Sequence, residues 1–153
     1  METHGLAQRG GVVVSDLAIG YDPTESPQCA TGEADVLIAL EALESLRSLP
    51  KLKKGGIAVV NTTTYHPLGV RYSKGEIEYP SLKTIEEELK KVTKNVLMVP
   101  AQEDAQALGV SQIMNMILIG ALAGNSEILP FTKEQIKEGM KEILPSKYLD
   151  VNY

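Results

Sequence analysis

Three short apolar runs alternate with segments of helical spacing, and this alternation limits the possible folds more than any other feature of the chain. The runs cover residues 34–40, 57–61 and 96–99. Strands that are apolar on both faces are typical of a parallel sheet with helices on each side, and parallel strands need long crossover connections. The pattern therefore predicts an α/β domain in three layers, with a mostly parallel sheet in the middle.

The connections between these runs carry helix signals. Leucines at positions 43, 46 and 49 predict a short helix that ends at Pro50. The next helix is expected to begin at Ser81 or Thr84, and Thr84 has capping-box spacing to Glu87. Residues 51–56 are expected to form a basic turn between the first helix and the second apolar run.

The last third of the chain predicts two further helices. Residues 102–108 form a short segment, and residues 112–123 are apolar almost all round. Such a helix should be buried by the sheet on one side and by something else, for which an oligomer or partner interface is one candidate, on the other. Thr132 and Gln135 predict a capped last helix. The core face of that helix is expected to hold Ile136, Met140, Ile143 and Leu144.

Two weaker strand signals remain. Residues 12–19 are rich in β-branched side chains and alternate towards their end, which predicts a strand. Residues 70–77 are compatible with a small hairpin around Lys74-Gly75.

The length, charge and composition of the chain limit the functional classes to which the protein can belong. A chain of 153 residues is expected to form one domain. A net charge of -5 with 5% aromatic residues disfavours binding to nucleic acid. The longest apolar stretch, residues 113–123, is too short to span a membrane. The single cysteine, Cys29, allows no internal disulfide and no cysteine-ligated cluster within the chain. We expect a cytoplasmic protein with neither nucleic acid nor membrane as partner.

Several catalytic signatures are missing from the sequence. It contains no P-loop, no G-x-G-x-x-G, no H-E-x-x-H, no G-x-S-x-G and no C-x-x-C motif. The two histidines, His4 and His66, both fall in expected loops, where exposure or a local hydrogen bond is the more common state. The sequence therefore predicts no catalytic residue and no metal ligand in this chain.

The first eleven residues form a dense, glycine-containing polar segment directly before the residue 12–19 run. The guanidinium of Arg9 suits bidentate binding of phosphate or carboxylate, and two glycines after it allow close backbone approach to a ligand. The alternative is that these glycines make a tight turn and Arg9 is solvated. The candidate binding residues of this segment are His4, Gly5, Gln8, Arg9, Gly10 and Gly11.

A second candidate position is the end of the middle apolar run. Asn61 and Thr62 stand at the carboxyl end of a buried strand, where open α/β sheets bind their ligands. Simple capping of the strand end is the alternative for Asn61, and the residues alone favour it.

The motif H-G-x-A-Q-R-G-G resembles the gamma-type subunits of 2-oxoacid:ferredoxin oxidoreductases, and within them the small, beta subunit of indolepyruvate ferredoxin oxidoreductases. The motif is the specific part of the resemblance, which runs through most of the chain. The segments that carry it are His4-Gly5-Leu6-Ala7-Gln8-Arg9-Gly10-Gly11, residues 32–44 and residues 55–62.

The resemblance implies a Rossmann-like fold and a role as the non-cofactor subunit. Enzymes of this family oxidatively decarboxylate arylpyruvates, reduce ferredoxin and form an aryl-acetyl-CoA. Thiamine diphosphate and the iron-sulfur clusters are implied on the large partner subunit, with none bound by this chain alone, and coenzyme A is a substrate. Residues 3–11 together with Asn61 and Thr62 are implied to contact the partner's active site and to assist recognition of coenzyme A.

Family members begin with a strand and a glycine-rich G-x-G-G-Q-G turn into a helix, which are missing here. We therefore expect residues 1–153 to form a single gamma-type domain that is incomplete at its N-terminus. Loss of an inner strand would leave an exposed apolar edge that favours oligomerisation or non-native pairing. Two alternatives stay open, a stand-alone module that binds coenzyme A or nucleotide without a redox partner, and a purely structural assembly subunit.

Overall fold

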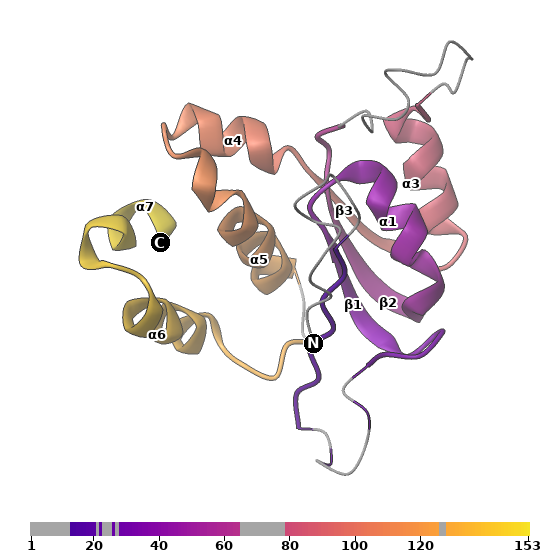
Figure 1. Ribbon diagram of the computed structural model, residues 1–153, viewed down its shortest axis with the longest axis horizontal. Coiled ribbons are helices and arrows are strands. Elements are labelled where there is room, and N and C mark those ends of the chain that lie inside the picture. The colour runs from indigo at the N-terminus through magenta and orange to yellow at the C-terminus, as the bar shows by residue number, and fades with distance from the viewer. Residues whose placement is uncertain (1–12, 21, 23–25, 27, 65–78, 126–127) are drawn as a thin grey trace.

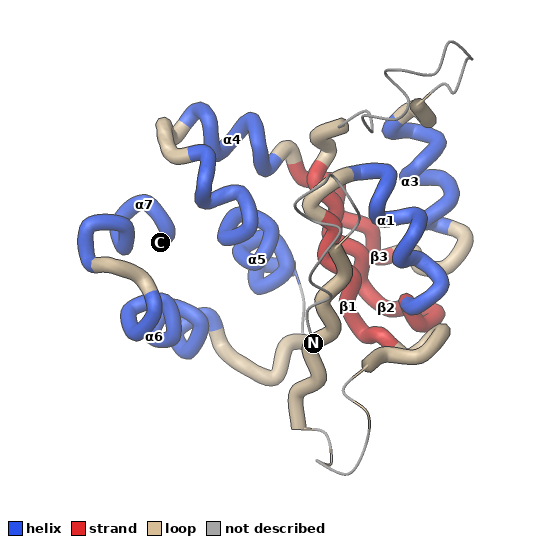
Figure 2. Tube along the Cα trace, in the orientation of Figure 1, coloured by secondary structure: helices blue, strands red, loops and turns tan. Residues whose placement is uncertain are grey.

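The computed structural model describes residues 13–20, 22, 26, 28–64, 79–125 and 128–153. Three strands form a parallel sheet in the order β1-β2-β3. They are β1 (Ala34–Ala39), β2 (Leu52–Asn61) and β3 (Asn95–Val99). Helices lie on both sides of the sheet (Figure 2), so the predicted three-layer α/β architecture is confirmed.

One face of the sheet is covered by α1 (Ala42–Ser48) and α3 (Leu82–Lys90), and the other by α5 (Met114–Asn125) (Figure 1). α4 (Ala101–Ala107) packs against α5. α6 (Lys133–Ile143) and α7 (Leu149–Asn152) lie beyond α5, away from the sheet. Short 3-10 turns precede β2, α5 and α7, at Leu49–Lys51, Ser111–Ile113 and Ser146–Tyr148. No helix in the described part of the chain is long and apolar enough to cross a membrane.

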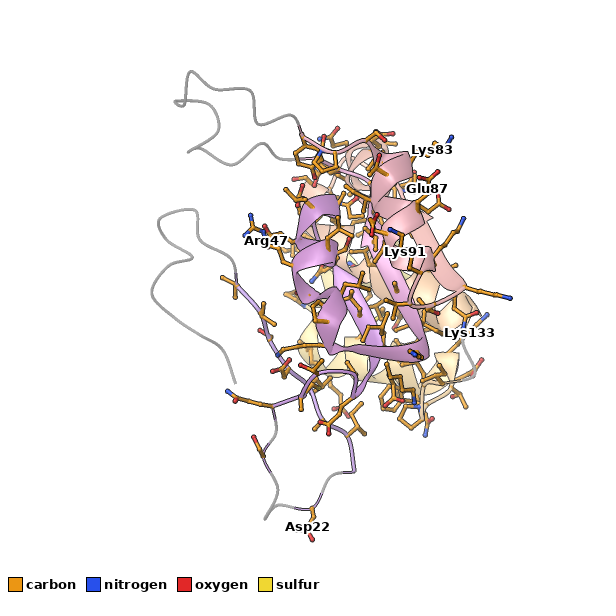
Figure 3. All side chains as sticks on the ribbon, turned by 90° about the vertical axis from the view of Figure 1, so that its right-hand side faces the viewer. Asp22, Arg47, Lys83, Glu87, Lys91 and Lys133 are labelled. Carbon is orange, nitrogen blue, oxygen red and sulfur yellow. The ribbon has the colours of Figure 1, made fainter. Side chains whose placement is uncertain are left out.

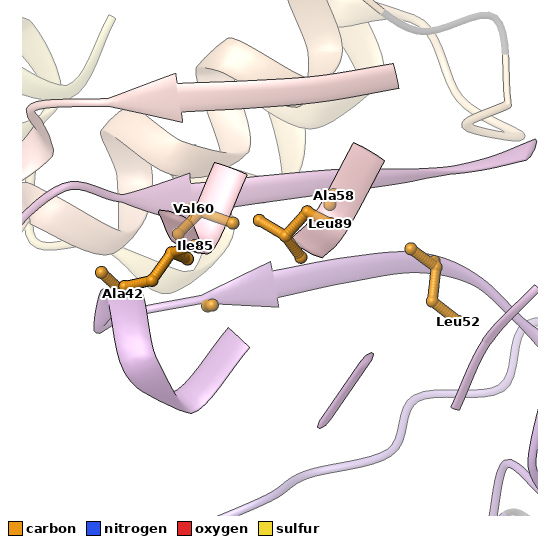
Figure 4. Close-up of a cluster of buried hydrophobic side chains, with 7 residues drawn as sticks. Ala42, Leu52, Ala58, Val60, Ile85 and Leu89 are labelled. Carbon is orange, nitrogen blue, oxygen red and sulfur yellow. The ribbon is translucent and has the colours of Figure 1, made fainter. Parts of the chain in front are cut away.

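Two apolar cores explain why β2 is apolar on both faces. Successive strand residues point to opposite sides, so Ala58 and Val60 pack under α1 and α3, while Ile57 and Val59 pack under α5. The first core is drawn in Figure 4 and consists of Ala39, Ala42, Leu52, Ala58, Val60, Ile85 and Leu89. The buried members of the second core are Ile57, Val59, Ala101, Leu118 and Leu122.

The predicted basic turn at residues 51–56 is wrong, because β2 already begins at Leu52. Ala34 pairs with Leu52 and Val36 with Ile57, so β2 carries an irregular insertion at this point. Gly55 has a φ of +80°, and a Cβ on Gly56 would lie 2.8 Å from the Asp35 carbonyl oxygen. The glycines that suggested a turn instead allow close contact between two strands.

The predicted strand at residues 12–19 is wrong for the described residues 13–19, which form an extended segment with an isolated bridge at Ser15. A β-branched sequence becomes a strand only when a neighbour pairs with it regularly, and residues 13–19 form no such ladder with another strand in the described part of the chain. The segment is held by a double contact between the Lys51 Nζ and the Asp16 carboxylate, at 2.7 and 2.8 Å.

The helix predictions had mixed outcomes. Ser81, rather than Thr84, caps α3, because its hydroxyl accepts from the Thr84 N–H. The capping box of Thr132 and Gln135 in α6 is confirmed. The predicted core face of α6 is wrong at Ile143, which is 81% exposed, while Ile136, Met140 and Leu144 are half-buried. The reason is that α6 buries no residue completely in the described structure.

The apolar α5 packs on the sheet as predicted, through Leu118 and Leu122. A partner interface on its other side stays a prediction. The charged side chains of Lys83 and Glu87 on α3, and of its C-cap Lys91, point away from the sheet (Figure 3). The hairpin predicted at residues 70–77 lies outside the described residues.

Candidate functional site at the carboxyl edge of the sheet

The carboxyl ends of the three parallel strands meet at one edge of the sheet. Backbone hydrogen bonds join them there, since the Thr62 N–H donates to the Val99 carbonyl at 2.9 Å and the Ala42 N–H donates to the Thr63 carbonyl at 3.3 Å. The loops leaving β1, β2 and β3 therefore start from a common, hydrogen-bonded base. This is the edge at which open α/β sheets bind ligands.

Asn61, the last residue of β2, is completely buried, and its side-chain amide joins several segments of the chain. Its Nδ2 donates to the Leu40 carbonyl at 3.0 Å and contacts the Met114 Sδ at 3.1 Å. Its Oδ1 accepts from the Thr63 N–H at 3.4 Å and from the Thr63 hydroxyl at 3.3 Å. The Gln102 N–H donates to the same oxygen at 3.4 Å.

These contacts give Asn61 a structural role. They tie the end of β1, the loop after β2, the first turn of α4 and the start of α5 to one point. Both amide N–H donors are used within the chain, as a buried polar group requires. The capping alternative raised by the sequence thus describes the observed contacts of Asn61. Direct contact between Asn61 and a ligand stays a prediction.

Thr62 and Thr63 differ in their side-chain contacts, although both are half-buried. The Thr63 hydroxyl donates to Asn61, whereas the Thr62 hydroxyl has no hydrogen bond to another described residue. Of the two hydroxyls, that of Thr62 is therefore the more available to a ligand at this edge.

A second polar cluster, which the sequence analysis missed, links the start of α1 to the segment before α3. The Tyr79 hydroxyl donates to Glu41 Oε1 and accepts from the Leu43 N–H at 3.0 Å. The other carboxylate oxygen of Glu41 caps α1 by accepting from the Glu44 N–H at 2.9 Å. Burial, and then the neighbouring Glu41 carboxylate, raise the pKa of the Tyr79 hydroxyl, which keeps it protonated as the donor of this pair.

The only sequence signal for this cluster was the place of Glu41 directly behind an apolar run, and nothing local pointed to Tyr79, 38 residues away. Tyr79 also borders a hollow of about 330 Å³. Its lining consists of Tyr79, Pro80, Ser81 and Thr84. Hydroxyl groups therefore line a concave surface beside the Glu41–Tyr79 pair.

The predicted site residues are only partly covered by the structure. Asn61 and Thr62 both lie at the carboxyl edge, as the sequence implied for the end of a parallel strand. The other six, His4, Gly5, Gln8, Arg9, Gly10 and Gly11, lie outside the described residues, as does His66. Whether the two sets meet stays a prediction. Cys29 is half-buried, and the described residues hold no group of three or more His, Cys, Asp or Glu side chains that could hold a metal ion.

Known proteins match this chain over nearly its whole length. The family model of the pyruvate ferredoxin/flavodoxin oxidoreductases matches residues 1–153. The chain is 39% identical over 151 residues to indolepyruvate oxidoreductase subunit IorB of Archaeoglobus fulgidus, covering 99% of this chain and 73% of that protein. It is 34% identical to the subunit of the same name from Methanothermobacter thermautotrophicus, covering 99% of this chain and 74% of the relative. A 2-oxoglutarate synthase subunit, KorC, of that organism is 27% identical, over 94% of this chain and 64% of the relative.

Proposed function

Since this chain belongs to the pyruvate ferredoxin/flavodoxin oxidoreductase family, we propose that it is the non-cofactor subunit of an indolepyruvate:ferredoxin oxidoreductase. In this proposal the assembled enzyme oxidatively decarboxylates indolepyruvate or another arylpyruvate. The carboxyl group leaves as carbon dioxide, the acyl group is transferred to the thiol of coenzyme A, and ferredoxin accepts the electrons. This chain assists assembly and the recognition of coenzyme A or substrate.

The observation that carries the proposal is the agreement among the relatives. Proteins 34–39% identical to this chain over 99% of its length are indolepyruvate oxidoreductase subunits. The more distant match to a 2-oxoglutarate synthase subunit supports the wider class of 2-oxoacid enzymes.

The redox cofactors are assigned in this proposal to a large partner subunit. An iron-sulfur cluster is held by several cysteine thiolates, whereas this chain contains one cysteine, Cys29. The residues of the chain therefore do not fit a cluster, and they contain no diphosphate-binding glycine motif of the P-loop type. Thiamine diphosphate supplies the decarboxylation chemistry when it is bound by the partner. We place the complex in the cytoplasm.

The carboxyl edge is our proposed contact surface for coenzyme A and for the partner's active site. Asn61 would act there by holding the strand-end loops in place, and the Thr62 hydroxyl would be available to the ligand. Arg9 and its neighbouring glycines would supply the anion-binding part of the site, because a guanidinium binds phosphate in a bidentate manner. The position of Asn61 and Thr62 at the edge where α/β sheets bind ligands supports this assignment.

The test is to co-express the chain with a thiamine- and iron-sulfur-containing large subunit. The two should co-purify and reduce ferredoxin in a reaction that needs both coenzyme A and indolepyruvate, measured by the absorbance change of ferredoxin. Full activity of the large subunit without this chain would overturn the proposal.

Arg9→Ala tests the anion-binding part separately. We expect either a KM for coenzyme A that rises by about tenfold or more, the equivalent of one lost charge-assisted contact, or weaker association with the large subunit. The isolated chain should keep its unfolding midpoint. Arg47→Ala is the matched control, because Arg47 lies exposed on α1 (Figure 3) and, among the described residues, forms an ion pair with Glu44 alone, at 3.1 Å. If KM and subunit affinity are both unchanged in Arg9→Ala, Arg9 is not part of the site.

A further inference from the structure

The first turn of α1 fastens both ends of the connection between β2 and α3. The N–H groups that open a helix have no partner within it. Here the Ala42 N–H donates to the Thr63 carbonyl at 3.3 Å. The next one, the Leu43 N–H, donates to the Tyr79 hydroxyl at 3.0 Å. Thr63 directly follows Thr62, whereas Tyr79 lies shortly before α3. Two neighbouring N–H groups thus hold two segments that are far apart in the sequence.

The side chain of Tyr79 is fixed at both of its ends. Its ring packs against the first apolar core, which α1 and α3 share on one face of the sheet (Figure 1). Its hydroxyl donates to the Glu41 carboxylate, and a hydrogen bond to a charged group is stronger than one between neutral groups. Glu41 is held in turn, because its other oxygen accepts from the Glu44 N–H at 2.9 Å. Packing and hydrogen bonds together therefore set the position of Tyr79 relative to the first turn of α1.

Thr63 connects this turn to Thr62. The N–H and the hydroxyl of Thr63 donate to Asn61 Oδ1 at 3.4 and 3.3 Å, while its carbonyl accepts from Ala42. The Thr62 N–H donates to the Val99 carbonyl at 2.9 Å. The backbone around Thr62 is thus held on each side, whereas its hydroxyl has no hydrogen bond to another described residue. A polar group on a fixed backbone is preorganised for a ligand.

We propose that Tyr79 and Glu41 are positioning residues, which set the place of the Thr62 hydroxyl at the carboxyl edge through the first turn of α1. This inference rests on the proposed function, in which Thr62 meets coenzyme A. Loss of the Tyr79 hydroxyl leaves the Leu43 N–H without its acceptor and releases the turn from Glu41 and Tyr79. Thr63 and Thr62 then lose one of their supports. Recognition of coenzyme A should weaken, although the contact between Thr62 and the ligand is chemically unchanged.

The first experiment measures ferredoxin reduction by the complex with the large subunit, at saturating indolepyruvate and varied coenzyme A. Tyr79→Phe should raise the KM for coenzyme A by about three- to tenfold and leave kcat nearly unchanged. Gly56→Ala is the matched control, because it is expected to destabilise the fold by contact with the Asp35 carbonyl, towards the opposite end of β2. It should leave the KM unchanged. An equal rise of the KM in both variants, or an unchanged KM in Tyr79→Phe, would overturn the positioning role.

A double-mutant cycle asks whether Tyr79 acts through Thr62. Thr62→Val removes the hydroxyl and nearly keeps the shape of the side chain, and it should itself raise the KM for coenzyme A. In this background Tyr79→Phe should change the KM by less than about twofold, because the group that Tyr79 positions is gone. A full effect of Tyr79→Phe in the Thr62→Val background would show that Tyr79 does not act through Thr62, and the proposal would fall.

A third experiment needs no activity, so it separates this inference from the proposed function. In the nuclear magnetic resonance spectrum of the backbone amides of the purified chain, Tyr79→Phe should shift the signals of Ala42, Thr62 and Thr63 as well as that of Leu43. These groups lie along one hydrogen-bonded path. Shifts confined to Leu43 would overturn the positioning role. A parent complex that reduces ferredoxin without coenzyme A would overturn the proposed function instead, and the amide signals would then decide the positioning role alone.

Discussion

Replacing Asn61 by alanine tests whether one buried amide organises the carboxyl edge of the sheet. The shortest oxygen contact, from Nδ2 to the Leu40 carbonyl at 3.0 Å, is a hydrogen bond of ordinary geometry and contributes about 0.5–1.5 kcal/mol net. The acceptor contacts at 3.3–3.4 Å are long and add less. Loss of the amide also leaves the Leu40 carbonyl and the Gln102 N–H without this partner, at about 1–3 kcal/mol.

The expected cost of Asn61→Ala is therefore about 2–4 kcal/mol in the free energy of unfolding. It is measured by urea titration, in which the midpoint should fall while the slope stays constant. Asn95→Ala is the matched control, because Asn95 is exposed and its side chain donates one bond, to the Gly55 carbonyl at 3.1 Å. Its cost should be about 0.5 kcal/mol. Equal, small costs for the two variants would refute the structural role of Asn61.

A substitution by aspartate separates the donor function of Asn61 from its shape. The carboxyl that Asn61→Asp introduces is nearly isosteric, yet it can donate to the Leu40 carbonyl only when it is protonated. Burial should raise its pKa in the folded state above the ordinary value of about 3.9. The penalty relative to the parent chain is thus smallest below the unfolded-state pKa of about 3.9, grows as the pH rises from there to the folded-state pKa, and is constant above it. A penalty that does not change with pH would contradict the assignment of Nδ2 as the essential donor.

Two further substitutions test other contacts. Tyr79→Phe should lower the free energy of unfolding by about 1–2 kcal/mol, because it leaves Glu41 and the Leu43 N–H without the hydroxyl. The pKa of Tyr79 is raised from its ordinary 10.0, so this stabilisation is complete below about pH 10 and declines above it. In urea titrations, the difference in unfolding free energy between parent and variant should therefore narrow above about pH 10. Gly56→Ala should destabilise the fold by about 1–3 kcal/mol, because its Cβ would meet the Asp35 carbonyl at 2.8 Å. Gly139→Ala in α6, where a Cβ meets nothing within 4 Å, should instead stabilise it by about 0.5–1 kcal/mol. A thermal unfolding midpoint that shifts in the same direction for both variants would contradict this account.

The parts of the fold that the sequence predicted are those whose cause is local. The run at residues 57–61 is apolar because both of its faces are buried, and the Thr132–Gln135 capping box needs only neighbours in sequence. The wrong predictions concern residues whose structure depends on contacts with residues far away in the sequence. Gly56 belongs to a strand because it passes under the Asp35 carbonyl. The helical spacing that marked Ile143 is present, but no core lies against it.

The candidate site shows the same division. Its place at the carboxyl edge followed from strand order alone, and so did the presence there of Asn61 and Thr62. The sequence could not predict which of the two side chains is held by the fold and which is available to a ligand, because the contacts of Asn61 come from segments as far along the chain as Met114. The Glu41–Tyr79 pair was missed for the same reason, since no local pattern joins residues 38 positions apart.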